Sequence, residues 1–354
     1  MEGSRVGSAS GALVLKIAVI APCWIAVPPA GYGGIELVVA LLADGLVDQG
    51  HDVTLFASGG STSKAKVDSY YETPPGTLRL VTDPIAELPH VLNAYSHAKK
   101  FDLIHDHSSP FGCSIGAHLE SPPVVHTLHG PLFDERAREI YQLIDGRLHL
   151  VSISDFQRQG APSLRYAATV YNGIDTDTYP FREAKEDYLL FLGRMSEQKG
   201  AHIAVEVAKT LGRRLIIATK IAEPGEHQYF EERVKPLLTD DVEMVGEISL
   251  KDKVELYANA ACTLMPIQWP EPFGLVMTES MACGTPVVAF RNGSVPEIID
   301  DGVTGFIVED EGAFVEAVSR VDTINPAACR ASVEERFSAK AMTAGYEAVY
   351  RSVI

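Results

Sequence analysis

Short apolar runs alternate with amphipathic segments along the whole chain. In the first half the apolar runs predict strands at residues 16–21, 52–57, 102–105, 123–128, 149–153 and 169–171. Between the first two runs, residues 35–49 carry apolar side chains at helical spacing and predict a helix. Strands that alternate with helices form parallel sheets with helices on both faces. The first half therefore predicts a doubly wound α/β domain.

The second half repeats this alternation after a polar segment at residues 172–186. It predicts strands at 188–192, 214–218, 242–245, 262–266, 286–290 and 305–308, and helices at 202–211, 226–238, 250–258, 275–282 and 311–321. We expect a small-residue tail at 1–15, a first domain at 16–176 and a second at 177–338. An amphipathic helix at 339–353 ends the chain, and we expect residues 339–354 to pack back on the first domain. Ligands of such sheets bind at the carboxyl ends of the strands, so a cleft between the domains is the expected site.

Composition and charge narrow the class of protein. The chain has 354 residues, a length typical of about two domains, and 46% hydrophobic with 22% charged residues is typical of globular proteins. A formal net charge of −17 argues against nucleic acid as a partner and against a basic membrane-docking face. The five cysteines are scattered, without a CxxC pair, and indicate reduced thiols in a cytoplasmic protein. Lys16 interrupts an apolar run that superficially resembles a signal peptide, and a buried strand explains the same residues.

The stretch 268–284, QWPEPFGLVMTESMACG, combines a helix start with two carboxylates, Glu271 and Glu279. The predicted helix start leaves four backbone amides without partners: those of Phe273, Gly274, Leu275 and Val276. Free amides at a helix N-terminus attract anions, so a ligand with phosphate and hydroxyl groups fits this stretch. An ordinary capped helix with two solvated glutamates is the alternative.

Two loops between a predicted strand and helix offer further ligand contacts. The glycines at 31–34, including Gly33 and Gly34, let backbone amides approach a ligand, although a simple turn explains them equally well and GxGxxG is absent. The loop 193–200 carries Arg194 and Lys199, a guanidinium and an ammonium suited to a diphosphate. Solvation at the surface is the alternative for both cations.

Histidines gather in the first half, at His105, His107, His126 and His129. The HDH sequence lacks an evident third ligand at metal-site spacing, so we expect no metal. His129, at the end of a predicted strand, is placed to hydrogen-bond a sugar or move a proton, and packing is the competing role. The chain has no P-loop.

The motifs, taken in order, resemble glycosyltransferase family 4, the retaining transferases of the GT-B fold, from residue 16 to residue 354. The resemblance rests on GYGGIE, TLHG, YNGID, GRMSEQKG, EPFGLVMTESMACGTPVVAF, GSVPEII and DGVTGF. Within the family the chain is most similar to the branch that contains the avilamycin-biosynthesis glycosyltransferase. The resemblance implies two Rossmann-like domains facing a central cleft.

The resemblance also implies a role for each matching residue. Arg194 and Lys199 would neutralise the departing nucleotide diphosphate without a metal or other cofactor. Glu279 would bind the ribose hydroxyls, and Glu271, with the amides of residues 273–275, would hold the donor sugar. Gly33 and Gly34 would lie near the phosphates and the acceptor, and His129 near an outer hydroxyl of the sugar. Gly193 and Val276 would also contact the donor.

We therefore expect a retaining transferase that moves a sugar from a UDP-sugar, such as UDP-glucose, to a soluble small-molecule or saccharide acceptor. Helix 35–49 contains no Lys or Arg, which favours such an acceptor over stable membrane association. The resemblance implies front-face attack with no enzymic nucleophile, and Glu271 as a covalent nucleophile is a lesser alternative. A nucleotide-sugar epimerase, a phosphorylase and an inactive nucleotide-sugar-binding protein stay open. The sequence leaves open the sugar, base, acceptor, oligomeric state and ligand contacts of His107 and Trp269.

Overall fold

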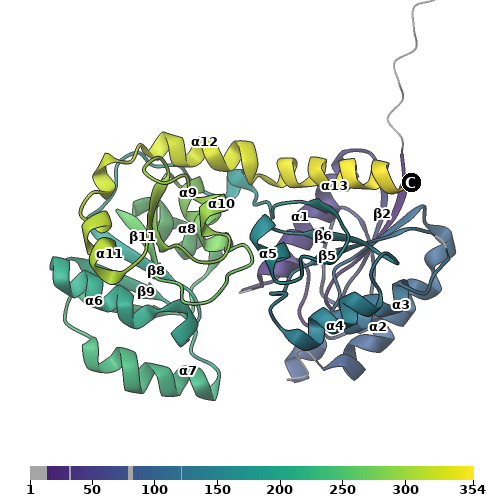
Figure 1. Cartoon of the computed structure of the whole chain (residues 1–354), viewed down its shortest axis with the longest axis horizontal. Helices are drawn as coiled ribbons and strands as arrows, with labels where there is room; N and C mark the ends of the chain where they lie inside the picture. Colours follow the sequence, from purple (N-terminus) through teal and green to yellow (C-terminus); the bar gives the residue numbers. More distant parts are fainter. Residues whose placement is uncertain (1–13, 32, 79–82, 121) are drawn as a thin grey trace, which may run out of the picture.

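A computed structural model describes residues 14–31, 33–78, 83–120 and 122–354. Two lobes stand side by side, and the helices α12 and α13 run along one edge of both (Figure 1). Each lobe contains one parallel sheet, with seven strands in the first and six in the second. The predicted fold class, two doubly wound α/β domains of the GT-B type, is confirmed. All of the predicted tail except Val14 and Leu15 lies outside the described residues.

The first sheet has the strand order β3-β2-β1-β4-β5-β6-β7. Its strands are β1 (Lys16–Ile20), β2 (Asp52–Phe56), β3 (Lys66–Asp68), β4 (Leu103–Asp106), β5 (Val124–Leu128), β6 (His149–Ser152) and β7 (Tyr166–Thr169). The central strands are almost entirely buried because helices cover both of their faces. The helices are α1 (Gly34–Asp48), α2 (Pro84–Ser96), α3 (Pro110–Gly116), α4 (Glu135–Leu143) and α5 (Asp155–Gln159). One core lies under α1 and α13, and the other under α2, α3 and α4.

The second sheet has the order β10-β9-β8-β11-β12-β13. Its strands are β8 (Tyr188–Leu192), β9 (Arg214–Ala218), β10 (Val242–Gly246), β11 (Cys262–Met265), β12 (Val287–Phe290) and β13 (Gly305–Val308). Its helices are α6 (Ala201–Leu211), α7 (Pro224–Tyr229), α8 (Leu250–Asn259), α9 (Leu275–Ala282), α10 (Val295–Ile298), α11 (Glu311–Val318) and α12 (Pro326–Arg336). One large core joins both faces of this sheet.

The chain returns to the first domain through α13 (Ala339–Val353). At the crossing, the amide of Ile174 donates to the carbonyl of Phe337 at 2.9 Å, and the amide of Ala339 donates to the carbonyl of Ile174 at 2.8 Å. Further along α13, the hydroxyls of Tyr346 and Tyr350 are buried among the strands of the first sheet. The last helix therefore supplies part of the core of the first domain.

The secondary structure differs from the predictions in several places, and strand β3 and helix α10 were not predicted. The helix predicted at 226–238 is present as a helical segment over residues 224–237, but only α7 is a regular α-helix: Phe230–Val234 is a π-helix and Lys235–Leu237 is a 3₁₀ turn that contains Pro236. The segment before α13 forms α12, which begins at Pro326 behind an Asn325 cap and was not predicted. The seventh strand covers residues 166–169 in place of 169–171. Among the described residues, no helix is long and apolar enough to cross a bilayer.

Candidate active site

The glycine loop of the first domain meets the start of α9 in the second. A Cβ on Gly34 would lie 3.2 Å from Cδ1 of Leu275, and one on Gly33 would lie 2.6 Å from Cδ1 of Ile25. No side chain larger than hydrogen fits at Gly33 without displacing its neighbours, and Leu275 packs on the core beneath α1. The N-termini of α1 and α9 thus face one another across the cleft.

The start of α9 has the free amides that the sequence predicts. Gly274 has a φ of +84°, which a glycine adopts without strain, and the first bond of the turn runs from the amide of Met277 to the carbonyl of Gly274 at 3.0 Å. In the part of the chain that the structure describes, the amides of residues 273–276 have no acceptor. Together with the helix dipole, these amides form a site for negatively charged oxygens.

Glu271 lies beside the start of α9, and one of its two carboxylate oxygens accepts two hydrogen bonds. Its Oε2 accepts from the ammonium of Lys199 and from Nε1 of Trp269, the latter at 3.1 Å. Lys199 Nζ also lies 5.2 Å from the centre of the Trp269 ring. No protein donor among the described residues reaches Oε1 of Glu271. The sequence left open which groups Trp269 contacts, and the structure shows that its ring lies against Lys199 while its Nε1 donates to Glu271.

The loop 193–200 carries both cations, and each is paired with a carboxylate, Lys199 with Glu271 and Arg194 with Glu226. Arg194 Nε donates to Oε1 of Glu226 at 2.8 Å, while the rest of its half-exposed side chain reaches toward solvent. The amide of Gln268 donates to the carbonyl of Gln198 at 2.8 Å, which ties this loop to the segment that carries Glu271. Gly193 lies beside Lys199: a Cβ added to Gly193 would be 3.8 Å from Cγ of Lys199.

Glu226 was not singled out from the sequence. Burial opposes its ionisation, but the amides of Ala222 and Glu223 and the guanidinium of Arg194 lower its pKa. It is therefore a buried carboxylate that orients Arg194. The sequence offered a signal only in the Glu223–Glu226 spacing of a helix cap.

Glu279 is almost fully buried and has three protein donors. They are the hydroxyl of Tyr179 at 2.8 Å, Nζ of Lys253 at 2.7 Å and the hydroxyl of Tyr257 at 3.1 Å. A carboxylate offers about four lone-pair sites, so one remains for a ligand hydroxyl. Contact with ribose stays a prediction. The three donors come from distant segments, and their sequence patterns gave no sign of this cluster.

His129 is half-buried at the end of β5. Its Nε2 lies 2.8 Å from Nδ1 of His107, and Gln157 Nε2 donates to the carbonyls of Leu128 and Gly130, both at 2.8 Å. His105 instead contacts Thr127 and Tyr350 within the core. Burial, with the neighbouring imidazole of His126, lowers the pKa of His129 to about 3. Among the described residues, no group of three His, Cys, Asp or Glu side chains could hold a metal ion.

This burial makes the stability of the fold depend on pH. His129 stays neutral in the folded chain, whereas in the unfolded chain its pKa is about 6.5. Below pH 6.5 the unfolded state binds more protons, so the free energy of unfolding falls as the pH falls toward 3. We expect His129→Asn to reduce the loss between pH 7.5 and 5.5 by about 1 kcal/mol, measured by urea denaturation. An unchanged pH dependence in the variant would contradict the neutral imidazole.

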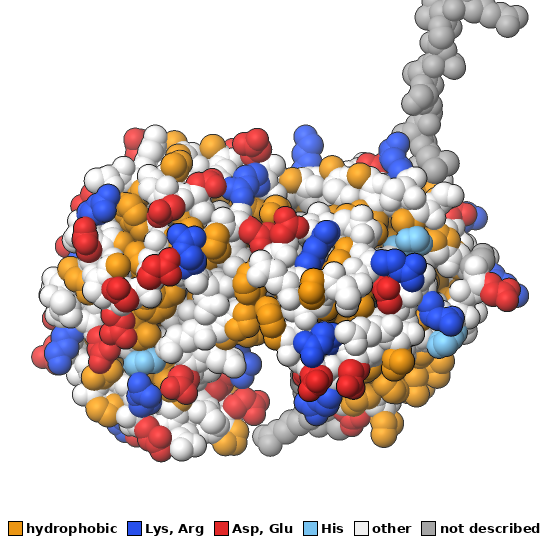
Figure 2. All heavy atoms as spheres, viewed as in Figure 1, with side chains coloured by type: hydrophobic (Ala, Val, Ile, Leu, Met, Phe, Trp, Pro, Cys, Tyr) orange, Lys and Arg blue, Asp and Glu red, His pale blue; other side chains and the backbone are white. Residues whose placement is uncertain are grey.

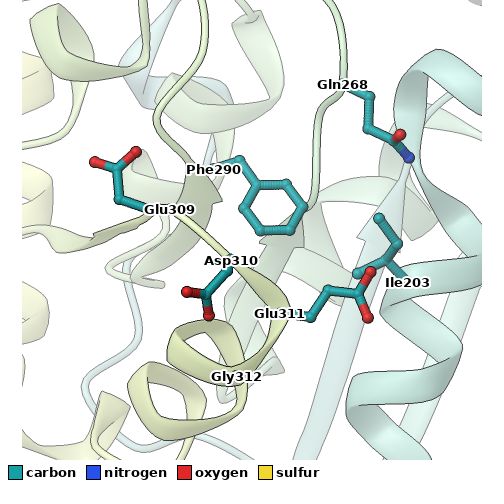
Figure 3. Close-up of a pocket in the computed structure, with 7 residues that line it drawn as sticks. All are labelled: Ile203, Gln268, Phe290, Glu309, Asp310, Glu311 and Gly312. Carbon is teal, nitrogen blue, oxygen red and sulfur yellow. The ribbon is translucent and has the colours of Figure 1, made fainter.

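A cavity of about 520 Å³ lies in the second domain. Figure 3 shows the residues that line it, Ile203, Gln268, Phe290, Glu309, Asp310, Glu311 and Gly312. Only Gln268 also belongs to the segment that leads to Glu271. On the face of the molecule in Figure 2, acidic and basic side chains are interspersed over both lobes.

Two protein-family models match this chain, one over each domain, and single relatives match most of its length. The family described as "Glycosyltransferase Family 4" matches residues 32–178, and "Glycosyl transferases group 1" matches residues 177–332. The spore coat protein SA of Bacillus subtilis is 27% identical over 84% of this chain and 86% of its own length. A D-inositol 3-phosphate glycosyltransferase of Mycolicibacterium smegmatis is 27% identical over 85% of this chain and 82% of its own length.

Solved structures match both domains together. A glycosyltransferase involved in avilamycin A biosynthesis superposes with a TM-score of 0.73 at 26% identity, over 95% of this chain and 97% of that one. The Anabaena protein HepE, solved in complex with UDP and glucose, has a TM-score of 0.73 at 21% identity, over 96% of this chain and 100% of that one.

Proposed function

Because the chain is a family 4-like glycosyltransferase of the GT-B fold that uses nucleotide-sugar donors, we propose that it transfers a sugar from UDP to a soluble acceptor with retention of configuration. The observation that carries this proposal is that Lys199 pairs with Glu271 beside the free amides at the start of α9. UDP is the proposed carrier because HepE was solved with UDP-glucose. The same comparison makes UDP-glucose the first donor to test.

The two cations and the helix amides supply the charge stabilisation that the reaction needs. When the bond between the anomeric carbon and the phosphate oxygen breaks, negative charge grows on the departing diphosphate. Lys199 and Arg194 neutralise this charge, with the amides of residues 273–276 as fixed donors, and no metal is needed for that role. Gly33, Gly34 and Gly193 let the backbone come close to the phosphates.

We assign Glu271 to the sugar and not to nucleophilic attack. Lys199 and Trp269 both bind its Oε2, which leaves Oε1 to accept a hydrogen bond from a sugar hydroxyl. The acceptor hydroxyl then attacks the anomeric carbon from the face that the phosphate leaves, and its proton passes to the departing phosphate oxygen. His129 is neutral and hydrogen-bonds an outer hydroxyl of the sugar, and Glu279 binds the ribose.

The acceptor is proposed to be a molecule dissolved in the cytoplasm. The support is α1, whose N-terminus meets α9 and which contains Glu36, Asp44 and Asp48 but no basic residue. A helix with this charge gains nothing from anionic lipid headgroups.

A thermal-shift screen of UDP-, GDP-, ADP- and TDP-sugars tests the donor. A ligand at a hundredfold excess over its Kd stabilises the folded chain by about 2.7 kcal/mol, and we expect the largest shift with a UDP-sugar. We then expect release of UDP to depend on an added saccharide, with the anomeric configuration of the product read by NMR. A larger shift with another base would contradict UDP. Release of UDP without acceptor would favour an epimerase, and an inverted product would contradict retention.

A further inference from the structure

A carboxylate of the second domain binds the start of a helix in the first. Glu297, on α10, accepts from the amide of Asp155 through Oε2 at 2.7 Å and from the amide of Phe156 through Oε1 at 2.6 Å. Tyr171, in the segment between the domains, donates to Oε2 at 3.1 Å. Figure 1 shows α10 and α5 at the junction of the two lobes. Because a carboxylate on helix amides forms charge-assisted bonds, this contact is stronger than an ordinary surface pair.

The same helix, α5, holds the loop that carries His129. Gln157, on α5, is buried and donates to the carbonyls on both sides of His129. Its own Oε1 accepts from the amide of Ile153 at 2.9 Å, so its orientation is fixed. A shift of α5 would therefore move His129.

On the donor side, the loop that leads into α10 holds the backbone of Glu271. The amide of Ser294 donates to the carbonyl of Glu271 at 3.0 Å, and Oγ of Ser294 donates to the carbonyl of Phe273 at 2.7 Å. At Gly293, with a φ of +60°, an added Cβ would lie 2.3 Å from the carbonyl oxygen of Glu271. A shift of α10 would move Glu271 and the start of α9 with it.

We propose that Glu297 is a positioning residue that latches the two domains and sets the distance between His129 and Glu271. A second bond across the cleft, from Oγ of Ser154 to the carbonyl of Pro272 at 2.6 Å, is buried and joins the same two segments. Both sides of the cleft are thus tied together by the carboxylate of Glu297 and by this second bond. The inference rests on the proposed function, since it concerns the residues assigned there to the donor sugar.

Glu297→Ala tests the latch because it removes both bonds to α5 while leaving Lys199, Glu271 and Glu279 in place. We expect kcat to fall by about tenfold to a hundredfold, the size of one or two lost charge-assisted hydrogen bonds. We expect the Kd for UDP, measured by calorimetry, to stay within about threefold, because Lys199, Glu271 and Glu279 are unchanged. Small-angle X-ray scattering should show a larger radius of gyration as the domains separate.

Two further variants separate positioning from a general loss of structure. Glu297→Gln keeps one acceptor oxygen for α5, and we expect it to restore part of kcat and of the compact scattering profile. Glu231→Ala is the matched control, since it removes an exposed glutamate of the same domain that pairs with Lys235, and should change neither. A fall in kcat matched by an equal loss of UDP affinity or by a collapse of Tm would overturn the latch.

Scattering also distinguishes this inference from the proposed function. If the wild-type chain transfers no sugar and Glu297→Ala still widens the molecule, the latch holds and the proposed function fails. If the wild-type chain transfers sugar and Glu297→Ala leaves kcat and scattering unchanged, only the latch is overturned.

Discussion

Lys199→Ala is expected to lower kcat by about a hundredfold to a thousandfold. Its ammonium pairs with Glu271 at the proposed diphosphate site. The variant therefore loses a fixed positive charge that would stabilise the negative charge growing on the departing diphosphate. Removal of one such preorganised donor typically costs about 2.7–4 kcal/mol of transition-state stabilisation. The measurement is kcat with the UDP-sugar that gives the largest thermal shift. Calorimetry with UDP should also show weaker binding.

The controls for Lys199 distinguish its position from its charge. Lys199→Arg keeps the charge but replaces a compact ammonium with a planar fork, so we expect partial activity. Lys235→Ala removes an exposed lysine paired with Glu231 at 2.6 Å and should leave kcat unchanged. An unchanged affinity for UDP in both Lys199→Ala and Glu279→Ala would exclude the nucleotide site assigned here.

The sequence predicted the elements that carry buried apolar runs, since their pattern depends on local spacing. The strands of both sheets other than β3 follow this pattern, as does α13, and the predicted bounds 339–353 match the helix that the structure contains. The helical segment predicted at 226–238 is present, but its apolar spacing gave no sign that the regular α-helix changes to a π-helix at Phe230 and to a 3₁₀ turn around Pro236. Periodicity alone does not register these breaks.

The sequence predicted those parts of the candidate site that lie within a single motif, but not the contacts between motifs. The free amides at the start of α9 follow from the Pro-Phe-Gly turn, and Lys199 and Glu271 were both singled out. Their contact, 72 residues apart in the chain, could not be predicted, because the order of parallel strands decides which loops meet. The same holds for Glu297, which the sequence offered only within the motif GSVPEII and which contacts α5 of the other domain.

Glu279 shows how a buried partner changes the meaning of a mutation. In isolation its motif suggested a ligand contact, whereas the structure gives it Lys253 and two tyrosines as partners. A substitution at Glu279 therefore alters stability as well as nucleotide affinity, and the two effects have to be measured separately.

Glu279→Ala is expected to lower the free energy of unfolding of the second domain by about 3–5 kcal/mol. The variant leaves the ammonium of Lys253 without its carboxylate and the fully buried hydroxyl of Tyr257 without an acceptor, and breaking a buried ion pair on one side typically has this cost. Glu279→Gln retains an acceptor and should lose less. Urea denaturation followed by the transition of the second domain gives the measurement.

The matched control for Glu279 is Glu243→Ala. Glu243 pairs with Arg214 at 2.6 Å, but about half of each side chain is exposed, so removal of this carboxylate should cost less than about 1 kcal/mol. If Glu279→Ala cost no more than Glu243→Ala, the ion pair with Lys253 would contribute nothing, and Glu279 would be free to serve the ligand alone. The other outcome is that Glu279→Ala costs several kcal/mol of unfolding free energy, while Glu279→Gln keeps the fold and weakens UDP binding. In that case the carboxylate of Glu279 both stabilises the second domain and contacts the nucleotide through its remaining lone pair.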